Sequence, residues 1–119
     1  MPSIRQTRTI YIVTPVINDI GIENGVKGYD TLTQYDLVDN VPASSENDIA
    51  LYGNGISDVI KFHKRQTIDL DSSVRYGLYL DNEPTLDVVS NLYQKPTYLI
   101  TKVLHYGRET LFDGTKQVY

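Results

Sequence analysis

Most of this chain alternates between apolar and polar residues, and few stretches repeat at the spacing of a helix. In the clearest run, residues 97–106, the even-numbered positions from Tyr98 to Leu104 share one face of a strand and the odd-numbered positions from Leu99 to His105 share the other. The run is rich in β-branched and aromatic residues, and Gly107 ends it. This pattern restricts the chain to a mainly β fold.

Other segments have the same character. In residues 7–14, Ile10 and Ile12 fall on one face and Tyr11 and Val13 on the other, so both faces of this strand are expected to be covered. Pro15 is expected to end it. The remaining predicted strands are residues 35–41 (stopped by Pro42), 58–65 and 75–80. Residues 56–62 also fit a helix, because Ile56, Val59 and Ile60 have helical spacing, but the strand is favoured.

Local signals predict one hairpin and one helix. Asp113-Gly114 lies between two short extended runs, which is typical of a type I′ hairpin turn. Ser44 is a good helix N-cap and acidic residues follow it, so a short helix should begin there and end near Gly53 or Gly55. Residues 69–73 read as a turn.

Residues 17–30 contain three glycines and residues 81–96 contain two prolines, in both cases among polar residues, and the two stretches are predicted to be long exposed loops. Together the segments predict a single domain over residues 1–119. Its expected architecture is a small five- or six-stranded barrel or rolled antiparallel sheet, with one short helix and two long loops.

Composition excludes several classes of protein. With 119 residues the chain is the size of one domain, and its net charge of −4 does not fit a general nucleic-acid binder. The absence of cysteine excludes thiolate chemistry and thiolate metal sites. No apolar run approaches the roughly 20 residues of a membrane span, so we expect a soluble, non-secreted protein with no membrane partner.

The residues available for catalysis are few. His63 lies in a basic run that suits either a solvated strand edge or an anion site, and its spacing from His105 does not indicate a metal pair. Gly53-Asn54-Gly55 follows the predicted helix, whereas phosphate-binding glycines precede one. We therefore expect no enzyme activity, and no catalytic, cofactor-binding or metal-binding residues.

Four sequence blocks carry a resemblance to a known family. They are VPASSE at residues 41–46, IALYG at 49–53, ISDVIK at 56–61 and PTYLITKV at 96–103. In this order they resemble the head-closure or head–tail connector proteins of tailed bacteriophages, also called stoppers or adaptors. Residues 81–96 depart from the pattern, because related chains more often have a short turn there.

The resemblance implies a small β-barrel that assembles as a homo-oligomeric ring below the portal and extends or gates the DNA channel. It implies contacts with portal or adaptor and tail proteins, transient non-specific passage of DNA, and no active site or cofactor. The protein would be made in the host cytoplasm and lie in the neck of the virion. The stopper, adaptor and tail-terminator roles stay open.

The family's channel or assembly loop has two candidates here, and the sequence does not decide between them. Their residues are Ile22, Glu23, Asn24, Val26 and Lys27 in the first, and Leu86, Val88, Val89, Leu92 and Tyr93 in the second. A rival interpretation is a monomeric small β-domain that binds a peptide or carbohydrate through tyrosine-rich loops, since the chain has ten tyrosines.

Overall fold

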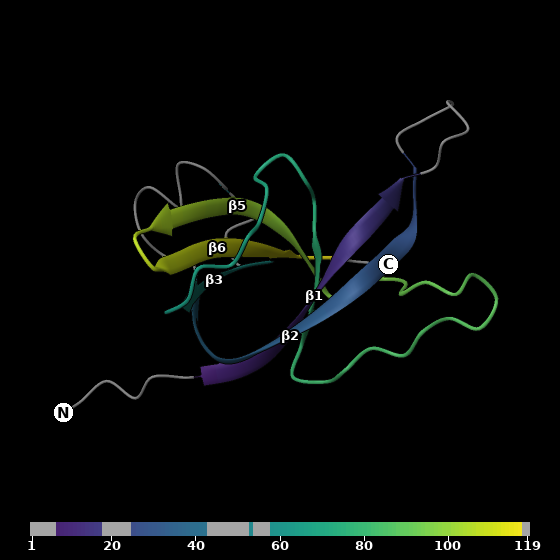
Figure 1. The fold of residues 1–119 in the computed structure, drawn as a ribbon, viewed down its shortest axis with the longest axis horizontal. Coiled ribbons are helices and arrows are strands. Elements are labelled where there is room, and N and C mark those ends of the chain that lie inside the picture. The colour runs from purple at the N-terminus through teal and green to yellow at the C-terminus, as the bar shows by residue number, and fades with distance from the viewer. Residues whose placement is uncertain (1–6, 18–24, 43–52, 54–57, 118–119) are drawn as a thin grey trace.

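A computed structural model describes residues 7–17, 25–42, 53 and 58–117. Six strands form the fold: β1 (Thr7–Ile17), β2 (Val26–Pro42), β3 (Val59–Lys64), β4 (Gly77–Leu80), β5 (Tyr98–Tyr106) and β6 (Glu109–Lys116). All neighbouring strands are antiparallel, and the sheet closes into a barrel in the order β1-β2-β3-β6-β5-β4 (Figure 1). The prediction of a mainly β fold, a barrel or rolled antiparallel sheet of five or six strands, is confirmed.

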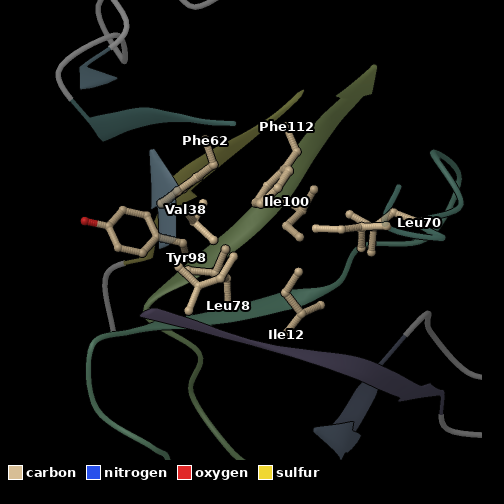
Figure 2. Packing of buried hydrophobic residues seen from close by; sticks show 10 residues of the cluster. Ile12, Val38, Phe62, Leu70, Leu78, Tyr98, Ile100 and Phe112 are labelled. Carbon is tan, nitrogen blue, oxygen red and sulfur yellow. The ribbon is translucent and has the colours of Figure 1, made fainter. Parts of the chain in front are cut away.

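The interior of the barrel is apolar and centred on two aromatic rings. Phe62 stacks on Phe112 with ring centroids 5.3 Å apart, and it meets Tyr98 edge to face at 6.4 Å. Figure 2 shows these rings pointing into the same space as Val38, Leu78 and Ile100. The inner faces of all six strands contribute to or pack against this cluster, as the alternation requires.

A second cluster covers the other face of β1. Tyr11 and Val13 pack there with Tyr29 and Tyr79, while Ile10 and Ile12 join the barrel interior. The prediction that β1 is covered on both faces is therefore confirmed.

β1 is longer than predicted and continues through Pro15 to Ile17. Pro15 lies opposite Tyr29, whose backbone N–H and C=O bond to Tyr93 on the far side and so point away from β1. The pair is thus of the non-hydrogen-bonded kind, and a proline there removes no bond from the β1–β2 ladder. Beyond Val13, β1 has no pairing with β4 that would need the missing N–H.

The predicted loop over residues 17–30 is correspondingly wrong at both ends. Ile17 closes β1, and Val26 to Asp30 belong to β2; residues 18–24 lie outside the described part of the chain. β2 pairs with β1 through several register shifts, and Thr31 and Leu37 adopt positive φ angles of 51° and 54°. Such bulges add residues to one strand and increase its twist. They allow the 17-residue β2 to belong both to the barrel and to the two-stranded part beyond it, residues 14–17 paired with 26–30, which is called the β1–β2 ribbon below.

β5 contains a bulge that breaks its alternation. Ile100 pairs with Gly114, but Lys102 pairs with Asp113, so Thr101 is the extra residue. Val103 consequently packs against the core, while Lys102 and Leu104 are exposed. The prediction that Lys102 and Leu104 share a face with Tyr98 and Ile100 is wrong, because a bulge exchanges the two faces of the strand beyond it.

The predicted hairpin turn at Asp113-Gly114 is also wrong. Both residues lie inside β6, where Asp113 pairs with Lys61 and Gly114 with Ile60 of β3. The turn between β5 and β6 is instead Gly107-Arg108, with Gly107 at φ 55° and Tyr106 paired with Glu109. Gly114 is required by packing, because a Cβ atom there would lie 2.9 Å from Cε2 of Phe62.

Of the remaining predictions, some are confirmed and one concerns residues that the structure does not describe. β3 matches the predicted strand, and a hydrogen bond from the Val74 amide to the Asp71 carbonyl closes a turn at residues 71–74. Gly53 has φ 56°, which suits a helix C-cap, but the helix predicted before it lies in residues that are not described. Among the described residues, no helix has the length and apolar character needed to cross a membrane.

Candidate functional site

The two candidate segments meet in space. Residues 81–96, called the docked loop below, pair with the free edge of β2 through Tyr93 and Tyr29, whose amides each donate to the other's carbonyl at 2.8 and 2.9 Å. The side-chain amide of Gln94 donates to the Lys27 carbonyl at 2.9 Å. The docked loop is the green segment reaching away from the barrel in Figure 1.

Close packing holds the second half of the docked loop in place. The Tyr79 hydroxyl donates to the Gln94 carbonyl at 2.7 Å, and the Tyr93 ring packs against the cluster of Tyr11, Val13, Tyr29 and Tyr79. Gly28 leaves the space that Leu92 and Gln94 occupy, because a Cβ atom on it would lie 2.8 Å from Leu92 Cβ. The long loop is therefore irregular, as predicted, but fixed to β2.

A turn built around Asp87 forms the tip of the docked loop. The Asp87 amide donates to the Leu92 carbonyl at 3.0 Å, and the Asn91 amide donates to the Asp87 carbonyl at 2.8 Å. Hydrogen bonds from the Ser90 hydroxyl and from the Val89 amide hold the pKa of the Asp87 carboxyl below its usual value. The tip therefore keeps a negative charge at neutral pH.

Two apolar side chains of this turn are exposed to solvent. Val88 and Val89 are each 94% exposed, and Leu86 is 40% exposed. The tip therefore presents apolar side chains to solvent, which makes it a candidate site for contact with another protein.

The structure divides the predicted site residues into three groups. Val26 and Lys27 are exposed on β2; Leu92 and Tyr93 are half-buried and attach the docked loop; Leu86, Val88 and Val89 are exposed on its outer half. Ile22, Glu23 and Asn24 lie outside the described residues. The described ends of the first expected loop, Ile17 and Val26 to Asp30, thus belong to the β1–β2 pair, and the second expected loop docks on β2.

The two histidines have different hydrogen-bond partners. His63 is in β3, which pairs with β2 on one side and β6 on the other, so it is not at a free sheet edge. Its Nε2 lies 3.0 Å from Glu109 Oε1 and its Nδ1 lies 3.8 Å from Asp39 Oδ2. His105 Nε2 lies 2.8 Å from the Ile68 carbonyl oxygen. No group of three or more histidine and carboxylate side chains within the described ranges is arranged to hold a metal ion.

The sequence analysis did not predict a hollow that lies at the end of the molecule opposite the docked loop. Its volume is about 310 Å³, and its walls are Thr7, Leu37, Asp39, Lys64 and Arg65, which come from β1, β2 and the end of β3. Leu37 is 72% exposed beside it. Leu37 has a positive φ, a conformation that costs most residues about 1–2 kcal/mol. Nothing in the sequence around a leucine predicts this conformation, so the hollow could not be found from the sequence.

Comparisons of the chain with protein-family models, with curated proteins and with solved structures found no match.

Replacing Gly28 by alanine is expected to lift the docked loop off β2 while the barrel stays folded. The new methyl group would lie 2.6 Å from Gln94 Nε2 and 2.8 Å from Leu92 Cβ, and the second atom cannot move without the loop backbone. Hydrogen exchange of the Tyr93 amide should accelerate about tenfold, which corresponds to ~1.4 kcal/mol of overpacking. Lys27→Ala, which changes an exposed neighbour, is the control. Unchanged protection of the Tyr93 amide in Gly28→Ala would contradict the docking.

Proposed function

We propose that this chain is a structural protein of a tailed-phage virion, a head-closure or head–tail connector subunit that forms a ring below the portal and extends or gates the DNA channel. The four sequence blocks that resemble this family support the proposal. The observation that carries it is the docked loop, which presents Val88 and Val89 almost wholly to solvent on a hydrogen-bonded turn. Such a feature suits a part that binds other proteins.

The barrel suits a connector subunit for mechanical reasons. Closing the sheet removes most free strand edges, so a subunit can meet its neighbours through chosen side chains instead of through uncontrolled strand pairing. The docked loop and the β1–β2 ribbon then supply contacts that extend beyond the rigid barrel. A net charge of −4 disfavours tight binding of DNA, which must slide through a channel.

A double replacement at the tip tests the proposal. Val88→Asp with Val89→Asp is expected to reduce binding to tailless phage heads at least about tenfold, because two charges would have to be buried at the contact. Stability should stay within about 0.5 kcal/mol of the parent, since both side chains are exposed. Bound protein is measured by co-sedimentation with heads and by electron microscopy of the region below the portal.

The matched control is Thr33→Asp with Thr97→Asp, which adds the same charge at two exposed positions outside the docked loop. The proposal fails if the parent protein adds no density below the portal under conditions in which heads accept tails. If the tip variant binds heads as well as the parent does, the docked loop does not take part in the contact with the head.

The rival peptide- or carbohydrate-binding domain receives less support from the side chains. Tyr11, Tyr29, Tyr79 and Tyr98 are buried in the two clusters, which leaves fewer tyrosines to hold a ligand. A screen for such ligands becomes the next step only if the parent protein does not bind heads.

A further inference from the structure

The tip of the docked loop and the hollow beside Leu37 lie at opposite ends of the molecule. Figure 1 shows the docked loop extending from one end of the long axis, whereas the start of β1 and β3 lie toward the other. The molecule is 52 Å long and 29 Å wide. The two features therefore cannot meet within one chain.

Their chemistry is complementary. The tip carries two apolar side chains, Val88 and Val89, next to the carboxylate of Asp87. The hollow carries one exposed apolar side chain, Leu37, next to the cationic side chains of Lys64 and Arg65. Apolar surface would thus face apolar surface, and the Asp87 carboxylate would face a wall that holds two cations, Lys64 and Arg65, and one carboxylate, Asp39.

The shapes also fit a projection entering a recess. The tip is a narrow turn that hydrogen bonds to Asp87 hold together, while a volume of about 310 Å³ can receive side chains of the size of valine. Lys64 is oriented at the wall of the hollow by donating to the Asp36 carbonyl, and Asp39 Oδ2 lies 3.8 Å from His63 Nδ1. Arg65 is exposed, so its guanidinium can be reached by the carboxylate of an approaching tip.

From these observations we infer that the tip of the docked loop of one copy seats in the hollow of a second copy, with Val88 and Val89 against Leu37 and Asp87 beside Arg65. The contact joins two different surfaces, so repeating it adds copies in one direction and closes into a ring when the rotation between copies allows. It deepens the proposed function by naming the contact between subunits of that assembly, and it rests on that proposal only for the ring's place in the virion.

Disulfide trapping tests the contact directly, because the chain has no cysteine of its own. The variant with both Leu37→Cys and Val89→Cys is oxidised at high protein concentration, free and after mixing with heads, and examined on a non-reducing gel. A disulfide needs Cβ atoms about 3.5–4.5 Å apart, so only a seated tip will be trapped. We expect a ladder of covalent oligomers from the double variant, and only dimers when the two single variants are mixed.

Three controls make the result specific. The pair Thr33→Cys with Val89→Cys, which moves one thiol to another exposed site of β2, should give little product. Adding Arg65→Glu to the trapping pair should lower the yield severalfold, whereas adding Lys102→Glu at an exposed site on β5 should not. Efficient dimers from Val89→Cys alone would indicate tips meeting each other and would overturn the inference.

The outcome also separates this contact from the proposed function. A ladder from the free protein together with no binding to heads would support the contact between copies and reject the connector role. Binding to heads with a double variant that stays monomeric after oxidation, both free and with heads, would reject the contact and leave the connector role standing.

Discussion

Replacing Phe62 by alanine is expected to lower the free energy of unfolding by about 3–5 kcal/mol. The Phe62 side chain is 1% exposed, stacks on Phe112 and meets Tyr98 edge to face. Removing it takes out both ring contacts and leaves a cavity in the barrel core, whose close-packed surroundings relax only in part to fill it. The loss is large beside the roughly 5–15 kcal/mol by which a domain of this kind is stable.

Urea denaturation followed by far-ultraviolet circular dichroism measures the effect, since the chain has no tryptophan to report by fluorescence. The control is Tyr106→Ala, which removes an aromatic ring that is 59% exposed and should change the stability by no more than about 0.5 kcal/mol. A loss below about 1 kcal/mol for Phe62→Ala would show that this ring is not at the centre of the core.

The second largest effect is expected at Gly114. Replacing Gly114 by alanine should cost about 1–3 kcal/mol, because the new Cβ atom would lie 2.9 Å from Cε2 of Phe62 and 3.4 Å from Cβ of Tyr98. The closest atom belongs to an aromatic ring packed on Phe112, which cannot turn aside freely. Urea denaturation again gives the magnitude.

A double-mutant cycle identifies the cause of that cost. In a Phe62→Leu background the ring edge is gone, so Gly114→Ala should become markedly less harmful and the two changes should not add. The comparison variant is Gly107→Ala, which has no atom within 4 Å of its new Cβ and acts only through the positive φ of that residue. It should cost about 1–2 kcal/mol independently of position 62. Strict additivity between positions 62 and 114 would contradict the packing described for Gly114.

The sequence was a reliable guide wherever the cause is local. Alternation located β3 and most of β5, and it indicated correctly that β1 is covered on both faces. Gly107 ends β5 as predicted, because a tight turn needs a residue that adopts positive φ. The irregular character of residues 81–96 was also readable, since their prolines and polar residues do not fit a strand.

The candidate site was only partly predictable for the same reason. Both segments were singled out as surface features, and Val88 and Val89 are indeed exposed. Their meeting depends on the pairing of Tyr29 with Tyr93 across 64 positions of sequence, and the hollow beside Leu37 depends on three strands converging. Neither arrangement leaves a pattern in a single stretch of residues.

The sequence by itself therefore determined the small, mainly β architecture and the approximate positions of most strands. Only the tertiary structure decided the roles of Gly114, Thr101 and Pro15. A glycine looks the same in the sequence whether it shapes a turn or makes room for Phe62, and Thr101 becomes a bulge only against its partners on β6. Pro15 is tolerated because the backbone of Tyr29, which lies opposite it, forms its hydrogen bonds with Tyr93 instead. Each outcome depends on contacts with distant residues, which periodicity along the chain does not record.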